Sequence, residues 1–230
     1  MRKLGTTLIA GALLFGLIGG AHAAKPVTVF EDPANDAGNY QQGLPLPPAT
    51  AAGLDLVSGS IVKSGTDLEF TVTNAAALPQ MGSAGEAFRL LWHLNVGGEE
   101  YRFTVKSLDV GKPDVLAQSG TDRVGKVYQG VARLEQCSEE ALPAVLTLVN
   151  CNVSEYFDAT FDPAAATVTW KVPLASLKAK TGTVVAGGTT GAASTNCQIC
   201  WVPHYAERSL TPSTIVDEAV MAKSYKVPKK

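Results

Sequence analysis

A short acidic segment near residue 35 has the residue types that a hard cation prefers. Asp32, Asn35 and Asp36 lie close together before Gly38, and Asp55 stands further on, at the start of an apolar strand pattern. Calcium takes six to eight oxygen ligands, which closely spaced carboxylates and amides on a glycine-bearing turn can supply. These four residues therefore predict a calcium site. Asp-Pro and Asn-Asp-Ala-Gly are also good turn formers, so a plain turn is the alternative.

The four cysteines predict disulfides rather than a reactive centre. An even number of cysteines in an oxidising compartment normally forms disulfides. Four cysteines can pair in three ways, and sequence alone leaves all three open. Proximity along the chain favours Cys137 with Cys151 and Cys197 with Cys200. A haem site would need His where Trp201 follows the last cysteine, and a closed zinc site would need a fourth ligand.

The residues after the last cysteine are the candidate ligand-binding rim. A small disulfide ring would brace the Gly-rich loop that precedes it and present Trp201, His204 and Tyr205 at one edge. Trp201 and Tyr205 are then the expected exposed platforms for a ligand such as a glycan.

Catalytic motifs are scarce. His93 and His204 have no Glu or His neighbour at the spacing of a zinc protease, and no nucleophile elbow or phosphate loop occurs. His93 falls on the polar side of its strand, so we expect it at the surface. Carboxylates that only the fold brings together, as in glycosidases, keep an exported hydrolase as an alternative function.

Alternating apolar and polar residues predict that β-strands position these groups. The strongest pattern flanks Gly97 and Gly98, where a two-residue turn predicts a hairpin. Its expected pairs on the buried face are Leu94 with Tyr101, Trp92 with Phe103 and Leu90 with Val105.

Similar patterns recur along the chain. Strands are expected at 27–30, 54–62, 68–72, 124–134, 145–149, 157–161, 168–172, 183–185 and 224–227, and a weak helical pattern covers 214–221. Trp170, like Trp92, falls on the buried side of its strand. The expected fold is all-β: one domain, residues 24–230, forming a jelly-roll-like antiparallel β-sandwich of about ten strands with little helix.

Several of these segments together resemble a known class of secreted bacterial domain. An Asp-Pro-x-x-Asp-x-Gly segment, a Leu-Asp-Leu strand start and a Phe-Asp-Pro turn before Thr-Val-Thr-Trp resemble the family-nine carbohydrate-binding modules and the wider DOMON-like class. The matching residues, within 27–176, are Asp32, Pro33, Asp36, Gly38, Asp55, Asp67, Phe161, Asp162, Trp170 and Pro173. The resemblance implies a calcium ion held by Asp32, Asp36 and Asp55, and sugar binding on aromatic platforms. The buried positions of Trp92 and Trp170 depart from the platform pattern.

The first 23 residues predict a cleavable secretory signal. Arg2 and Lys3 precede an apolar run from Leu8 to Ile18, and Ala21-His22-Ala23 forms a cleavage site before Ala24. The apolar run is about ten residues, whereas a membrane-spanning helix needs roughly 20. We therefore expect a secreted protein, extracellular or periplasmic, without membrane insertion.

The charge balance narrows the expected partners. The chain has 19 Lys and Arg and 21 Asp and Glu, and loss of Arg2 and Lys3 leaves 17 against 21, a net charge of −4. This argues against nucleic acid and anionic membranes, which bind clustered positive charge. The expected function is a non-catalytic, calcium-stabilised module that binds a glycan or another extracellular protein. An exported hydrolase and a structural cell-surface component are the alternatives.

Overall fold

The all-β class is confirmed. The computed structural model describes residues 24–38, 46, 48–78, 88–107, 129–142, 146–188, 197–203 and 215–229, which form twelve strands and one short helix. The expected signal peptide, residues 1–23, lies outside the described residues. No helix in the described part is long and apolar enough to cross a membrane.

All twelve strands belong to one antiparallel sheet. Their bounds are β1 (Val27–Glu31), β2 (Leu56–Ser64), β3 (Asp67–Asn74), β4 (Phe88–Val96), β5 (Glu99–Ser107), β6 (Gln129–Leu142), β7 (Leu146–Asp162), β8 (Thr167–Pro173), β9 (Val184–Gly187), β10 (Ile199–Pro203), β11 (Asp217–Ala219) and β12 (Tyr225–Lys226); helix α1 is Pro48–Gly53. The main order is β1-β2-β3-β8-β7-β6-β5-β4-β10-β11. Strand β9 pairs with the second half of β4, and β12 pairs with β9.

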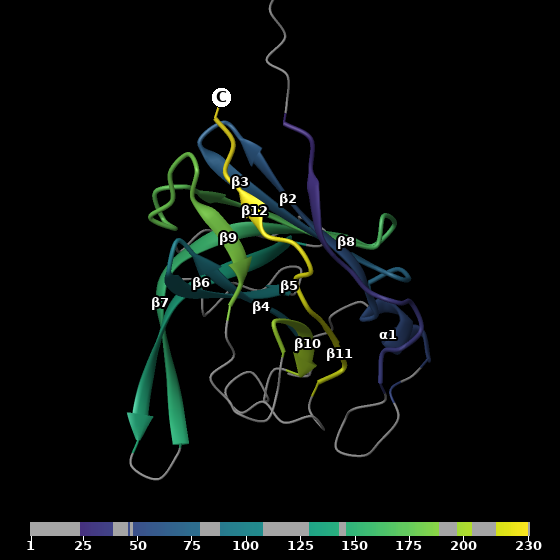
Figure 1. Ribbon diagram of the computed structural model, residues 1–230. Helices are drawn as coiled ribbons and strands as arrows, with labels where there is room; N and C mark the ends of the chain where they lie inside the picture. Colours follow the sequence, from purple (N-terminus) through teal and green to yellow (C-terminus); the bar gives the residue numbers. More distant parts are fainter. Residues whose placement is uncertain are drawn as a thin grey trace, which may run out of the picture.

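The sheet curls until its two ends meet, so its shape is nearly that of a barrel (Figure 1). At the meeting point, the Leu56 amide of β2 donates to the Asp217 carboxylate of β11. The amides of Ala222 and Lys223 donate to the Val29 carbonyl of β1 at 2.9 and 3.1 Å. These bonds satisfy edge groups that an open sheet would leave unpaired.

The central hairpin is confirmed in its predicted register. Leu94 lies opposite Tyr101, Trp92 opposite Phe103 and Leu90 opposite Val105. Gly97 and Gly98 have φ angles of 62° and 101°, which glycine adopts without the steric cost of a Cβ.

The interior of the curled sheet is filled by aromatic side chains. The Phe70 ring lies 5.5 Å from Trp92, 5.1 Å from Phe103 and 5.5 Å from Trp170, and Phe30 completes the group beside Trp92. All five are at most 1% exposed. The predicted core positions of Trp92 and Trp170 are confirmed.

Strand β7 differs from the prediction of separate strands at 145–149 and 157–161. It runs unbroken for 17 residues and pairs with β6 from Leu146 to Thr160. Their far halves extend beyond the pairing with β5 and β8 and project from the rest of the sheet (Figure 1). The predicted disulfide Cys137–Cys151 is confirmed and joins the two strands in this projecting part.

Removing this disulfide is expected to destabilise the protein. With a sequence separation of 14, its loss in a Cys137→Ser/Cys151→Ser double variant should lower the free energy of unfolding by about 3 kcal/mol, because the unfolded chain regains loop entropy. Urea unfolding under non-reducing conditions measures the change. Ser138→Ala, at an exposed neighbouring position, is the control. Equal stability of the double variant and wild type would contradict the prediction.

Candidate metal centre

The turn that follows β1 is held against the two meeting ends of the sheet. The Asp32 amide donates to the Val57 carbonyl of β2 at 2.8 Å, and the Gly38 amide donates to the Val216 carbonyl beside β11 at 2.7 Å. Between them Asn35 has a φ angle of 74°, which Asn tolerates better than most residues. The acidic segment therefore lies where the sheet closes.

Three carboxylates meet at this place. One oxygen each of Asp32, Asp36 and Asp217 lies within 4.8 Å of the other two. Two of the four predicted ligands are thus brought together, and the third member comes from the far end of the chain. Sequence reasoning missed Asp217, because it lies 181 residues after Asp36 and the pattern at 214–221 predicted a helix where β11 forms.

Asp217 is fixed by the backbone around it. Its side chain is buried, one oxygen accepts the Leu56 amide at 2.5 Å, and the other accepts the Glu218 amide at 2.9 Å. These two bonds aim the carboxyl group at the seam between β2 and β11. Carboxylate oxygens can accept more than one contact, so both remain able to bind a cation.

Asp55 lies beside the three carboxylates and is 1% exposed. One of its oxygens accepts the Asn35 amide at 2.5 Å, whereas the other has no hydrogen-bond partner among the described residues. One Asp32 oxygen is also buried and has no hydrogen-bond partner among the described residues. Buried polar atoms normally have partners, so these two oxygens are candidate ligand atoms. The predicted roles of Asn35 and Asp55 as ligands stay predictions.

Burial, with a smaller effect of neighbouring negative charge, raises the pKa values of Asp217 and Asp32. Burial is the main cause for Asp217, whose pKa rises from 3.8 to about 7, with the charges of Asp32 and Asp36 adding to it and the amide of Leu56 opposing it. Burial, followed by the charges of Asp36, Asp55 and Glu218, raises the pKa of Asp32 to about 6. A bound cation would offset this repulsion and favour the ionised carboxylates.

The predicted ligand-binding rim differs from the structure at Trp201. Trp201 lies in β10 with no exposed area, and its indole N–H donates to the Asn74 side chain at 2.8 Å. The expectation that Trp201 is an exposed platform is therefore wrong, because its ring is part of the main apolar core. His204 and Tyr205 lie outside the described residues.

The Cys197–Cys200 disulfide is also confirmed. Both cysteines are fully buried and pack in a small apolar cluster with Leu91, Val202 and Ile215. Burial keeps this disulfide away from solvent thiols, which suits the expected structural role.

His93 is buried, so the expectation of a surface histidine is wrong. It lies opposite Arg102 and is only 5% exposed. Burial, with a smaller effect from the charge of Arg102, lowers the pKa of His93 to about 3. The ring is therefore neutral at physiological pH.

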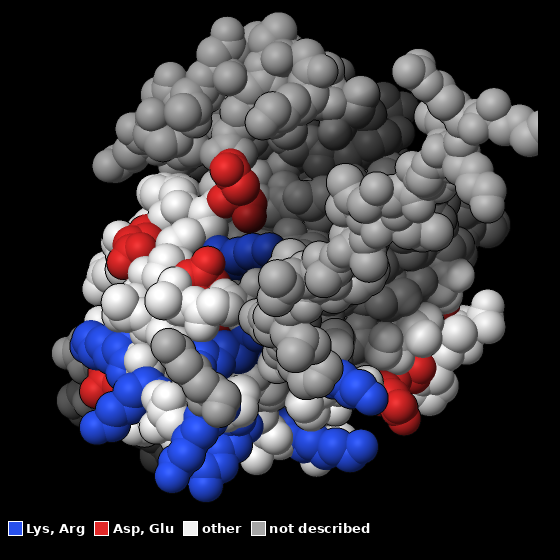
Figure 2. Space-filling view, turned by 90° about the horizontal axis from the view of Figure 1, so that it is seen from above, with Lys and Arg blue, Asp and Glu red and all other residues white. Residues whose placement is uncertain are grey.

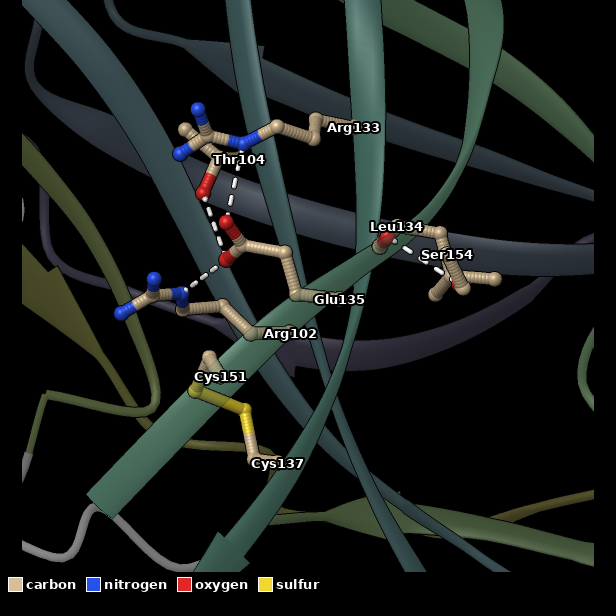
Figure 3. A network of polar contacts seen from close by, with 8 residues as sticks. All are labelled: Arg102, Thr104, Arg133, Leu134, Glu135, Cys137, Cys151 and Ser154. Atoms are coloured by element: carbon tan, nitrogen blue, oxygen red, sulfur yellow. Dashed lines mark hydrogen bonds and ion pairs between the residues drawn. A yellow bond between two sulfur atoms is a disulfide. The ribbon is translucent and has the colours of Figure 1, made fainter.

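A buried ionic network on β5 and β6 was not predicted (Figure 3). One of its members, Arg102, lies opposite His93. The Glu135 carboxylate accepts hydrogen bonds from Arg102 at 2.5 Å and from the Thr104 hydroxyl at 3.2 Å, and it forms an ion pair with Arg133 at 2.9 Å. These side chains come from the neighbouring strands β5 and β6, which the register places side by side. Both Glu135 oxygens are engaged, so the network braces the sheet rather than offering a free base.

A small pocket lies next to this network. It is lined by Arg89, Thr104, Lys106, Val131, Arg133 and Tyr156. It has room for roughly one water molecule, which is too little for an organic substrate. The acidic group at the closing seam is therefore the better candidate site.

Comparisons with family models, with curated proteins and with solved structures find no match. The resemblance to family-nine carbohydrate-binding modules and the DOMON-like class therefore stays a prediction.

Proposed function

We propose that the chain is an exported, non-catalytic binding module whose curled sheet is closed by a calcium ion. In this proposal the two halves of the sheet face each other as the layers of a β-sandwich. The observation that carries the proposal is the meeting of Asp32, Asp36 and Asp217 beside Asp55, a buried carboxylate with an unpartnered oxygen. The two disulfides suit an oxidising compartment outside the cytosol.

The position of the acids explains what a cation would do. Asp32 and Asp36 follow β1, Asp55 precedes β2, and Asp217 lies in β11. An ion held by these residues would join the first strands of the sheet to the last. Hard oxygen ligands of this kind suit calcium, with backbone carbonyls and water able to complete its coordination.

Calcium is expected to raise the melting temperature. An ion that binds only the folded state adds about 2.7 kcal/mol at a hundredfold excess over its Kd. For a domain of this size that corresponds to about 5 to 10 °C. Differential scanning calorimetry with calcium, and then with a chelator, measures the effect.

Matched variants separate a specific site from general ionic effects. Asp36→Ala removes an exposed member of the acidic group and should abolish the calcium response, while Asp67→Ala, in the first position of β3, should keep it. If magnesium or sodium at matched ionic strength shifts the wild-type melt as much as calcium does, the segment is only a turn.

An exported hydrolase is a second candidate because Asp32 and Asp217 face each other with raised pKa values. Two such carboxyls meet one requirement of acid and base catalysis. The two backbone amides that bind Asp217 favour the structural role over proton transfer. Turnover of aryl glycosides by wild type, lost in Asp32→Asn, would support the hydrolase instead.

A further inference from the structure

Five lysines gather at one end of the molecule, where β2 ends and the chain reaches its C-terminus. We call this surface the basic end; its members are Lys63, Lys178, Lys180, Lys226 and Lys229. All except the half-buried Lys63 are exposed. Figure 2 looks down on this end and shows Lys and Arg side chains gathered on one side of it.

Backbone contacts hold three separate segments together at the basic end. Lys226 of β12 lies opposite Val184 of β9. The turn before β9 is closed by the Lys180 amide, which donates to the Thr183 hydroxyl at 2.9 Å. The Lys63 ammonium of β2 donates to the Pro228 carbonyl at 3.4 Å. The fold therefore fixes the backbone positions of these lysines.

Acidic residues at this end are few among the described residues. Lys178 forms an ion pair with Glu99 at 3.7 Å, and both side chains are at least half exposed, so water screens the pair. Asp67 lies opposite Ser64 at the turn between β2 and β3. Glu155 accepts the Ser176 hydroxyl near Lys178, and Glu69, opposite Val62, pairs with Lys171 at 3.1 Å. With Lys171 counted, six lysines face four acids among the described residues, so the local charge is positive although the whole chain is acidic.

The basic end is separate from the acidic centre. Leu56, whose amide binds Asp217, begins β2, and Lys63 lies seven residues further along the same strand. At about 3.3 Å per residue this places the two sites roughly 23 Å apart. The Debye length is about 8 Å at physiological salt, so the negative charge of the acidic centre does not cancel the positive charge of the basic end.

We propose that the basic end binds a linear anionic polysaccharide, with carboxylate or sulfate groups along its chain. This inference rests on the proposed role as a binding module and names its ligand. Lysine ammonium groups on flexible stems act as point charges and suit anions repeated along a polymer. The surface is accessible outside the cell, where the predicted signal sends the chain.

The same surface fits other polyanions less well. None of the aromatic side chains in the described ranges is exposed, so bases of a single-stranded nucleic acid have no described ring to stack on. Val184 of β9 and Val27, which lies opposite Ile61 of β2, are large exposed apolar residues near these lysines in the described ranges. Separate valines give little to insert into a bilayer. An anionic polysaccharide, which lysines can bind through charge alone, fits this surface best.

Binding of defined oligosaccharides tests this proposal. Titration calorimetry in calcium-free buffer would use a heparin octasaccharide for sulfate, an oligogalacturonate for carboxylate and a neutral cello-oligosaccharide. We expect the anionic probes to bind and the neutral one not to bind. For three lysine contacts at a slope of about 0.7 per contact, affinity should fall roughly 20-fold between 50 and 200 mM salt.

A triple variant, Lys178→Gln/Lys180→Gln/Lys226→Gln, should lose this binding while melting like wild type, because all three side chains are exposed. The control is Lys223→Gln, an exposed lysine whose amide contacts Val29 in the middle of β1. Failure of both anionic probes, or equal binding by the triple variant, would overturn the proposal. Tighter binding of single-stranded DNA or anionic phospholipid vesicles would overturn the ligand class.

The Asp36→Ala variant distinguishes this proposal from the calcium site. It should lose the calcium response and still bind the anionic probes, because the basic end lies at the other end of β2. A wild type that binds the anionic probes but does not respond to calcium contradicts only the proposed metal centre. A wild type that responds to calcium but does not bind the anionic probes contradicts only the basic end.

Discussion

Replacing Trp92 by Ala is expected to lower the free energy of unfolding by about 3 to 5 kcal/mol. The ring has no exposed area and contacts three other aromatic rings, Phe30, Phe70 and Trp170, at centroid distances of 5.5 to 5.9 Å. Its removal leaves a cavity at the centre of the curled sheet that rings attached to several strands cannot all move to fill. Chemical denaturation followed by circular dichroism measures the loss.

Two further variants make the Trp92 test specific. Trp92→Phe keeps most of the apolar contact and should cost less than Trp92→Ala. Val153→Ala, at a position that is 44% exposed, should change stability by no more than about 0.5 kcal/mol. A Trp92→Ala variant that unfolds at the wild-type midpoint would show that the inner face of β4 is wrongly assigned.

The apparent affinity for calcium is expected to weaken about 1000-fold from pH 8 to pH 5. Calcium binds ionised carboxylates, so it must displace the protons that Asp217 and Asp32 hold below their pKa values of about 7 and 6. At pH 5, displacing the proton of Asp217 lowers the calcium affinity about 100-fold, and displacing that of Asp32 lowers it about tenfold. Together these reductions correspond to about 4 kcal/mol of binding free energy. Calcium titrations by calorimetry at pH 5, 6, 7 and 8 measure the trend.

Stability without calcium has two opposing contributions. Because the pKa values of Asp217 and Asp32 are raised, the folded protein keeps protons between about pH 4 and pH 7 that the unfolded chain loses, so the contribution of these acids falls as pH rises. The pKa of His93 is lowered to about 3, so the unfolded chain gains a proton below about pH 6.5 and stability falls as pH falls.

Comparing samples with and without calcium at each pH removes the His93 contribution. Only the effect of calcium itself then remains. A calcium affinity that is the same at pH 5 and pH 8 would contradict a site made of Asp32 and Asp217. A His93→Gln variant should keep the pH trend of calcium binding, because His93 is not part of the acidic group.

Local sequence pattern was sufficient for several features. The alternation around Gly97 and Gly98 predicted the hairpin register, since a two-residue turn leaves one way to keep Trp92 and Phe103 on the same face. Proximity of the cysteines predicted both disulfides. Each of these depends on residues that are close along the chain, where few geometries are possible.

The burial of His93 and Trp201 depended on tertiary structure. Alternation assigned His93 to a polar face, yet that face carries a second layer of contacts, including the apolar cluster around the Cys197–Cys200 disulfide. Trp201 becomes buried because its ring packs in the main apolar core with residues from many other strands. A pattern within one strand shows which residues share a face and cannot show what covers it.

Part of the candidate metal centre was predictable from local sequence, and part depended on the tertiary structure. The sequence by itself determined that Asp32 and Asp36 lie on one turn, because five consecutive residues cannot separate far. Only the tertiary structure added Asp217, and only it separated the acidic centre from the basic end along β2. The physical reason is that curling the sheet brings its first and last strands together, and this closure is set by the packing of the whole aromatic core rather than by any local spacing.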